Sequence, residues 1–569
     1  MVDRTHTSTY RLQLHAGFTF ADAEQAVPYL ARLGVSHLYL SPILQAAPGS
    51  MHGYDVVDHG RVSTELGAQA GLVALAGTAH AHGLGVMCDI VPNHMAIPAP
   101  EHLNPQLWEL LREGRHSKSA SWFDVDWDLC DGRLGLPVLG APLDEVIASG
   151  ELTLDTVDAD GSGPERVLRY HEHVFPLTDG THEGASDNVD IADLAAGQHY
   201  LLGSWREKER LLAHRRFFDV DTLIAVRVED PAVFDATHAV LLDLHRRGVL
   251  DGFRIDHPDG LADPEGYLAR LAETSDGAWV VVEKILERSE RLPARWATAG
   301  TTGYDACSVI QTALAPTTGA ELDSLWREVG TGASLAQTEL SAKRQVLSEL
   351  LSPELERLLR LVHRAADEAH LSVGDPATVR GALVEILVHV AVYRAYLRPG
   401  HQADDESVEQ LVRMVHAARQ AKPELAAELD LLHRLLGDVA SSSEAGRDLV
   451  VRFQQVCGPV MAKGVEDTTF YRWNRLIVLN EVGGDPQALD SPGPEGLHAW
   501  AAYQQEHWPL GMTTLSTHDT KRSEDLRARL LAVAADSDAW TQSWQHVAVK
   551  AARYDVDGPT AYLLFQTLL

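Results

Sequence analysis

The sequence predicts an α/β protein built from strand–helix–strand units, and one stretch of the chain indicates this most clearly. Residues 252–256 alternate apolar and polar side chains and end in Asp256 before a Pro/Gly turn, whereas residues 279–282 are a continuous apolar run followed by Glu283. Such a run is typical of a strand buried on both faces. A helix expected to begin near Asp263 lies between them, and a strand, a helix and a strand of this length form a right-handed parallel unit. Asp256 and Glu283 are therefore expected at the same edge of a sheet.

Two carboxylates at the C-terminal ends of neighbouring parallel strands are the pair that a retaining glycosidase uses. One acts as nucleophile and the other as acid and then base, about 5–5.5 Å apart. Arg254 precedes Asp256 by two residues, so it shares a strand face with that carboxylate and is expected to hold it ionised. The alternative is a pair of strand-end acids without a catalytic role, and these residues alone leave both interpretations open.

Three earlier strands are expected at residues 10–14, 35–40 and 85–91. Loops at the C-terminal ends of such strands carry the chemistry of parallel α/β enzymes. The loop after the second strand holds Tyr54, whose ring offers an apolar face to a sugar or anchors the loop. His94 follows the third strand and is placed to donate to a substrate hydroxyl, or it is structural.

Four short motifs occur in order along the chain: Asp89–His94, Gly252–Asp256, Val282–Glu283 and Ser516–Asp519. In this order they resemble the strand-end motifs of the α-amylase superfamily. Longer runs are similar to the maltooligosyltrehalose synthase family within it, and the likeness extends through nearly the whole chain; these runs are residues 41–44, 51–55, 215–220, 300–305 and 458–467.

The resemblance implies a (β/α)₈ TIM barrel and an isomerase of the glucosylmutase type. Such an enzyme converts the reducing-end α-1,4 bond of a maltooligosaccharide to an α,α-1,1 bond by retaining double displacement, as in trehalose biosynthesis. It also implies that Asp256 is the nucleophile, Glu283 the acid and base, and Asp519 the third carboxylate, which holds sugar hydroxyls. The residues expected to bind substrate are Tyr54, His94, Arg254, His257, Lys284 and His518.

Two other functions stay open from the residues themselves. An α-1,4-glucan hydrolase of the same fold uses the same three acids, with water in place of the sugar hydroxyl as second nucleophile. A catalytically silent barrel that binds carbohydrate is the second alternative, although such a protein is expected to lose at least one of the three acids. Loops that exclude water decide between isomerase and hydrolase, so the isomerase prediction depends on the resemblance.

The strand–helix rhythm fails in two places, which indicates insertions. The sequence predicts barrel segments at 1–94, 213–318 and 451–569, an inserted subdomain at 95–212 after the third strand, and a large helical insertion at 319–450. Within the helical insertion, Ser352 is expected to cap a helix whose first residue is Pro353, and apolar residues follow at helical spacing.

Composition restricts the class of partner. With 48 basic and 81 acidic residues the net charge is −33, which repels nucleic acid and anionic membrane surfaces. The four cysteines have no metal-ligand spacing, and we expect neither a metal nor an organic cofactor. No apolar signal segment or membrane span is found, so a cytoplasmic location is expected. The resemblance also implies functional coupling to a trehalose-releasing hydrolase.

The last expectation concerns the number of strands. Besides the five strands at 10–14, 35–40, 85–91, 252–256 and 280–283, we expect a sixth within 303–465 and a seventh at 513–516. The eighth strand and the C-terminal β domain of the family are not found, so the chain is expected to be a fragment with two open sheet edges and low activity alone.

Overall fold

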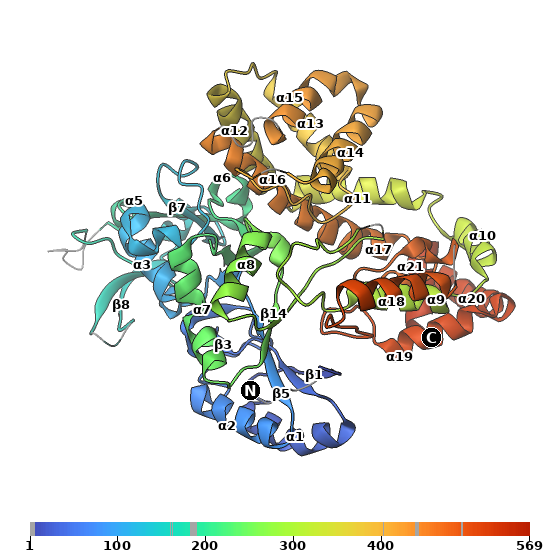
Figure 1. Ribbon diagram of the computed structural model, residues 1–569. Helices are drawn as coiled ribbons and strands as arrows, with labels where there is room; N and C mark the ends of the chain where they lie inside the picture. The colour runs from blue at the N-terminus through green and yellow to red at the C-terminus, as the bar shows by residue number, and fades with distance from the viewer. Residues whose placement is uncertain are drawn as a thin grey trace. The chain divides into compact units, whose positions relative to one another are not determined.

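A computed structural model describes residues 6–159, 161, 163–181, 190–288, 290–401, 403–437, 443–490 and 493–569. The chain divides into two compact units, Met1–Val280 and Val281–Leu569. Figure 1 shows the helices and strands of both units.

A five-stranded sheet is the centre of the first unit, in the order β1-β2-β5-β14-β15. The first four strands pair in parallel. The strands are β1 (Thr9–Leu12), β2 (His37–Leu40), β5 (Gly85–Ile90), β14 (Gly252–Ile255) and β15 (Trp279–Val282), whose last two residues belong to the second unit. The helices between them are α1 (Phe20–Leu33), α2 (Ala68–Ala81), α7 (Pro231–Arg246) and α8 (Pro264–Thr274). The strands predicted at residues 10–14, 35–40, 85–91, 252–256 and 280–283 are confirmed.

Local sequence explains these elements. All residues of β2 and β5 are buried, and both strands are mainly apolar apart from His37 and Asp89. Helix α1 begins with a capping box in which Thr19 and Asp22 satisfy each other's backbone N–H groups, and it ends at Gly34 in the left-handed conformation. Helices α7 and α8 begin with an aspartate cap followed by proline, the start that the sequence predicts for α8.

Residues between β5 and α7 form small sheets rather than strand–helix units. One sheet joins β12 (Arg216–Phe217), β13 (Val220–Ala225) and β6 (His94–Ala96); a second joins β10 (His173–Pro176), β9 (Glu165–Tyr170) and β8 (Leu152–Val157); a third joins β11 (Tyr200–Ser204) and β7 (Leu134–Leu139). The helices here are α3 (Pro105–Glu113), α4 (Leu143–Ala148), α5 (Ile191–Ala196) and α6 (Lys208–Leu211). The loop after β2 contributes the hairpin of β3 (Leu44–Ala46) and β4 (Val56–Val62).

Beyond β15, the described residues of the second unit form helices joined by irregular segments, with no further named β-strand. Its helices are α9 (Tyr304–Leu314), α10 (Gly319–Val329), α11 (Leu335–Glu349), α12 (Ser352–Glu368), α13 (Pro376–Val388), α14 (Asp405–Ala421), α15 (Ala426–Leu436), α16 (Glu444–Met461), α17 (Phe470–Arg472), α18 (Glu495–His507), α19 (Glu524–Ala534), α20 (Ser537–Ala551) and α21 (Gly558–Leu568). A π-helix, η7 (Ala462–Thr469), continues α16. A helix begins where the sequence predicts one, but the predicted cap is wrong by one residue: Leu351 is the N-cap, no side chain caps the helix, and Ser352 and Pro353 are its first two residues.

The predictions for the sixth and seventh strands are wrong. In the described residues of 303–465 the chain is helical or irregular, and residues 513–516 form no regular strand. Instead, Thr301 makes a single parallel bridge to Val282, and the Met512 N–H donates to the Thr301 carbonyl at 2.9 Å.

The sixth prediction fails because its residues form helices and irregular segments, and near the seventh the contacts are single ones beside a close backbone approach. Gly300 has a φ of +139°, and a Cβ there would lie 2.7 Å from the Gly511 Cα. Such a conformation is suited to glycine and interrupts a ladder. A closed eight-stranded barrel is therefore not seen in the part of the chain that the structure describes.

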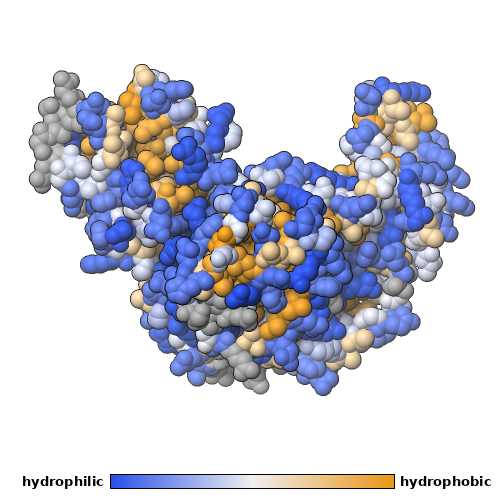
Figure 2. Space-filling model, turned by 90° about the horizontal axis from the view of Figure 1, so that it is seen from above, coloured by the Kyte–Doolittle hydropathy of each residue, from blue (hydrophilic) through white to orange (hydrophobic). Residues whose placement is uncertain are grey.

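The face of the molecule in Figure 2 is mainly hydrophilic. Hydrophilic residues cover most of the face in Figure 2, and hydrophobic residues form separate patches between them. Among the described helices, none is long and apolar enough to cross a bilayer. The four cysteines are buried free thiols.

Gly252→Ala is predicted to destabilise the first unit. An added Cβ would lie 2.7 Å from the Trp279 carbonyl oxygen and 3.1 Å from its ring, so the substitution forces the two strands apart. We expect the free energy of unfolding to fall by about 1–3 kcal/mol. Gly77→Ala in α2 is the matched control, because no atom lies within 4 Å of its added Cβ. Urea denaturation measures both, and equal stability of the two variants contradicts the packing account.

Candidate active site

The site in the first unit is built on a buried arginine between two aspartates. The pairing of β14 with β5 aligns Arg254 with Asp89. One Arg254 nitrogen, Nη1, donates to Asp89 Oδ1 at 2.7 Å and to Asp256 Oδ1 at 2.6 Å. Arg254 is 1% exposed and Asp256 6%. The predicted contact of Arg254 with Asp256 is confirmed, and this guanidinium balances two buried carboxylates at once.

Two tyrosines satisfy the second oxygen of Asp89. Asp89 Oδ2 accepts from the Tyr39 hydroxyl at 3.1 Å and from the Tyr54 hydroxyl at 2.5 Å, and Arg11 donates to the Tyr54 hydroxyl at 3.2 Å. Burial raises the pKa of both tyrosines, so they remain donors at neutral pH. The Tyr54 hydroxyl therefore anchors its loop to Asp89, while sugar stacking on its ring stays a prediction.

Two histidines lie against aromatic rings beside this network. Burial, followed by the charge of His257, lowers the pKa of His94 to about 3, so its ring is neutral. His94 Nε2 lies 3.1 Å from the Tyr54 carbonyl, which can only accept, so the one N–H of the neutral ring is used there. The His94 ring also packs on Phe217 at 4.6 Å. His257 has a φ of +43° and lies edge-on to Phe217 and Phe218.

Glu283 is the first residue after β15, and its neighbour Lys284 lies in a buried ion pair. The Lys284 ammonium is 2.9 Å from the Glu290 carboxylate and donates to the Ile285 carbonyl at 2.6 Å. Lys284 is fully buried. The expectation that Lys284 binds substrate is corrected here, because groups of its own segment hold its ammonium away from solvent.

The third predicted carboxylate, Asp519, is held by hydroxyl and imidazole groups. Its Oδ2 accepts from the Tyr304 hydroxyl at 3.1 Å and lies 3.1 Å from His518 Nε2. Tyr304 is buried at the start of α9 and also contacts Thr517 at 2.9 Å. The Asp519 side chain is 42% exposed, so a ligand in solvent can reach its carboxylate.

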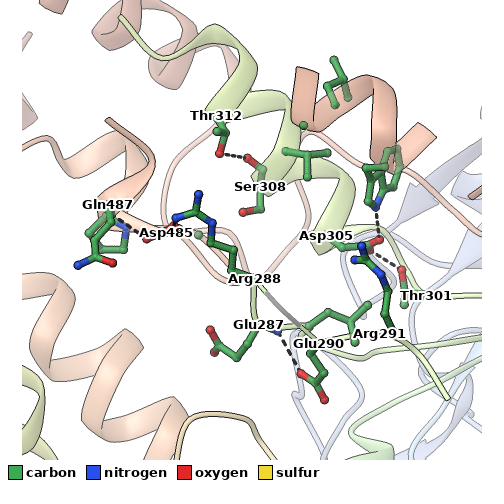
Figure 3. Close-up of a pocket in the computed structure, with 18 of the residues that line it drawn as sticks. Glu287, Arg288, Glu290, Arg291, Thr301, Asp305, Ser308, Thr312, Asp485 and Gln487 are labelled. Atoms are coloured by element: carbon green, nitrogen blue, oxygen red, sulfur yellow. Dashed lines mark hydrogen bonds and ion pairs between the residues drawn. The ribbon is translucent and has the colours of Figure 1, made fainter. Parts of the chain in front are cut away.

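A cavity of about 800 Å³ lies within the second unit. In Figure 3 the labelled residues approach it from several segments: Arg288 points toward Asp485, at 3.3 Å, and Asp305 accepts from Thr301 and from the Trp500 ring N–H at 2.6 and 2.9 Å. None of the nine predicted site residues is among the described residues that line this cavity.

Two carboxyl groups of the cavity hold protons near neutral pH. Burial, assisted by the charges of Glu290 and Glu466, raises the pKa of Glu287 to about 8. Burial raises the pKa of Glu466 to about 7, although the Tyr393 hydroxyl donates to it at 2.7 Å. Among the described residues no cluster of three or more His, Cys, Asp or Glu side chains is arranged to hold a metal ion.

Sequence reasoning found the acids but missed several of their partners. Asp89 was expected only as part of a motif, and Tyr39, Tyr304 and Glu290 were not expected in the site at all. The apolar character of β2 carries a signal for Tyr39, because a tyrosine in a buried strand needs a hydrogen-bond partner. Tyr304 and Glu290 carry no comparable signal, since their partners are distant in sequence or lie in an irregular segment.

Comparison with known proteins gives first the class. Residues 23–107 match the family described as alpha amylase, catalytic domain. This match indicates an enzyme class of the α-amylase type for that part of the chain.

Longer matches give the particular family. The structure is similar to that of maltooligosyltrehalose synthase from Arthrobacter ramosus, with a TM-score of 0.86 and 42% identity over 98% of this chain and 68% of that chain. It is similar to a Sulfolobus tokodaii protein described as a hypothetical maltooligosyl trehalose synthase, with a TM-score of 0.81 and 30% identity over 99% and 69% of the two chains. A Mycobacterium tuberculosis protein named for the same enzyme is 39% identical over 99% of this chain and 69% of its own length. The chain belongs to the maltooligosyl trehalose synthase family.

Arg254→Met is predicted to be strongly destabilising. It leaves Asp89 and Asp256 buried without their cation, which costs about 3–5 kcal/mol of unfolding free energy. Arg247→Met is the control, because Arg247 pairs with Asp243 on the exposed face of α7 with both side chains about half exposed. That variant is expected to change stability by less than about 0.5 kcal/mol. Denaturant titration compares them, and a similar small change in both contradicts the charge network.

Glu287 and Glu466 are predicted to make stability fall as pH rises. Their raised pKa values mean that the folded chain binds the protons more tightly than the unfolded chain, so stability is lost between about pH 5 and pH 8. In Glu287→Gln/Glu466→Gln this loss is removed, and the variant gains stability relative to the parent at higher pH. Urea midpoints at pH 5 and 8.5 measure the difference. Glu328→Gln, which changes an exposed acid of α10, serves as control. If the stability difference between the double variant and the parent chain is the same at both pH values, the two carboxyls are not protonated in the folded chain.

Proposed function

We propose that this chain converts the reducing-end α-1,4 bond of maltooligosaccharides to an α,α-1,1 bond, forming maltooligosyl trehalose. The observation that supports this most is the 42% identity over 98% of the chain to a maltooligosyltrehalose synthase. The substrate is a neutral glucan, so the acidic surface does not oppose its approach.

In this proposal three carboxylates perform the first step. Glu283 gives its proton to the bridging oxygen while Asp256 attacks the anomeric carbon and forms a covalent glycosyl-enzyme. Asp519 holds hydroxyls of the distorted sugar and strengthens that hold in the transition state. The contact of Arg254 with Asp256 supports the nucleophile assignment, because a guanidinium beside a carboxylate orients it and favours its charged form.

The second step decides between isomerisation and hydrolysis. Glucose released at the reducing end turns over, and its C1 hydroxyl attacks the glycosyl-enzyme while Glu283 accepts the proton. The two displacements together retain configuration. Water in place of that hydroxyl gives hydrolysis, so the proposal requires the loops around the released glucose to exclude water. An α-1,4-glucan hydrolase is the second candidate, since the same acids serve both reactions.

The same proposal includes the predicted substrate-binding residues and the predicted division of the chain into barrel segments and insertions. Tyr54, His94, His257 and His518 are proposed to line the sugar site. Barrel segments at 1–94, 213–318 and 451–569 are proposed to carry the chemistry, with insertions at 95–212 and 319–450. The α,α-1,1 product is a substrate for a hydrolase that releases trehalose, so this is the class of reaction that follows.

Incubation with maltopentaose tests the function. We expect reducing ends to disappear without shortening of the oligosaccharide, and Asp256→Asn and Glu283→Gln each to lower the rate by several orders of magnitude, roughly 10³-fold or more, because each removes a covalent or proton-transfer role. Reducing-sugar assays and chromatography of chain length measure both quantities.

Glu273→Gln is the control, because Glu273 is an exposed acid at the end of α8 in the same part of the chain. It is expected to keep full activity. A gain of reducing ends with shortening means that the chain is a hydrolase, and no change in either quantity supports the silent barrel.

A further inference from the structure

The segment after Glu283 contains a fully buried ion pair that the reaction itself does not use. Lys284 and Glu290 have side chains that are 0% and 4% exposed, and their charged atoms are 2.9 Å apart. A buried pair of this kind contributes little net stability, because desolvation offsets the attraction. Such a pair can instead fix a conformation, because separating the two groups leaves an uncompensated buried charge.

Aromatic rings from a distant part of the second unit cover the ammonium. Lys284 Nζ lies 5.4 Å from the centre of the Tyr393 ring and 5.8 Å from that of Tyr396, within cation–π range. Both tyrosines lie between α13 and α14. Tyr393 is itself fixed, because its hydroxyl donates to Glu466 on η7 at 2.7 Å. The Lys284 ammonium therefore ties the segment after Glu283 to the helical part of the unit through these two rings.

Glu290 also braces the turn of its own segment. Its carboxylate accepts from the Glu287 N–H at 3.1 Å, and its backbone N–H donates to the Glu287 carbonyl at 2.8 Å. Figure 3 shows Glu287 and Glu290 in this contact. One carboxylate thus holds both the lysine next to Glu283 and the turn that follows.

We propose that Lys284 and Glu290 are positioning residues, which hold the backbone next to Glu283 so that its carboxyl can protonate the leaving oxygen. This rests on the proposed role of Glu283 as acid. Lys284 is joined to Glu283 by one peptide bond, so a displacement of Lys284 moves the acid directly. A shift of about 1 Å in a catalytic group lowers a rate about 10²-fold.

The leaving group of the substrate separates positioning from general damage. Maltopentaose needs a proton on its departing sugar, whereas fluoride leaves α-maltosyl fluoride without one, so a misplaced acid slows only the former. We expect Lys284→Met and Glu290→Gln to lower kcat on maltopentaose by about 10- to 100-fold, with KM changed less than about threefold. The rate of the first fluoride released per active site should stay near that of the parent chain, and Lys284→Arg should restore part of kcat on maltopentaose.

Arg344→Met is the matched control. Arg344 makes two contacts, of 2.7 and 3.0 Å, with the buried Glu385 in the same unit, so its loss disturbs packing without touching the segment after Glu283. Its effect should be equal on both substrates. Circular dichroism and urea unfolding confirm that the variants are folded, and Lys284→Met/Glu290→Met, which removes both charges, provides a folded variant if either single change unfolds the chain.

Glu283→Gln distinguishes the two proposals. If Glu283→Gln loses maltopentaose activity but keeps the first fluoride release, Glu283 is the acid. In that case, equal losses on both substrates in the Lys284 and Glu290 variants, or no loss in them, overturn the positioning role and leave the role of Glu283 standing. If Glu283→Gln keeps maltopentaose activity, the assignment of Glu283 fails and the positioning role fails with it.

Discussion

The contact of Arg254 with Asp89 and Asp256 is the interaction on which the first unit depends. One guanidinium nitrogen serves both carboxylates, at 2.7 and 2.6 Å, inside the sheet. A carboxylate buried without a cation costs several kcal/mol, roughly 3–5, so the pairing of β5 with β14 is restricted to the register that brings these groups together. A slip by one residue would turn Arg254 to the opposite face. The tyrosines of β2 and its loop complete the network, which joins three strands through their polar groups.

The carboxylates assigned to the reaction lie in contrasting environments, and the contrast fits their proposed roles. Asp256 is 6% exposed beside a guanidinium, which suits a nucleophile that must be ionised and fixed in direction. Asp519 is 42% exposed and held by the Tyr304 hydroxyl, which suits a group that exchanges solvent for sugar hydroxyls. Glu283 has a third kind of environment. Its neighbour Lys284 is held in a buried ion pair, so the backbone beside the acid is constrained through that neighbour.

Sequence patterns predicted these features unevenly, and the reasons are physical. The five strands at β1, β2, β5, β14 and β15 were predictable because apolar runs and turn residues bound them. The sixth was not, because the described residues of 303–465 form helices and irregular segments. The seventh was not, because only single contacts form beside the close approach of Gly300 to Gly511. The Arg254 contact followed from two-residue alternation, which strand geometry imposes. Lys284 was misjudged as a substrate ligand because its partner Glu290 lies in an irregular segment, where spacing carries no directional information.

The account centres on Asp256 as the nucleophile of a retaining reaction, and trapping the covalent intermediate tests this most directly. In a 5-fluoro-α-maltosyl fluoride, the fluoride at the anomeric carbon is a good leaving group, so the covalent intermediate still forms. The ring fluorine slows the release of that intermediate, so the glycosyl group accumulates on the nucleophile. Mass spectrometry of the digested protein then locates it. The account predicts a gain of one fluoromaltosyl group, on the peptide that contains Asp256. A label on another carboxylate would contradict it. Protein that stays unlabelled and active while it continues to release fluoride, with no stable intermediate on Asp256, would contradict it as well.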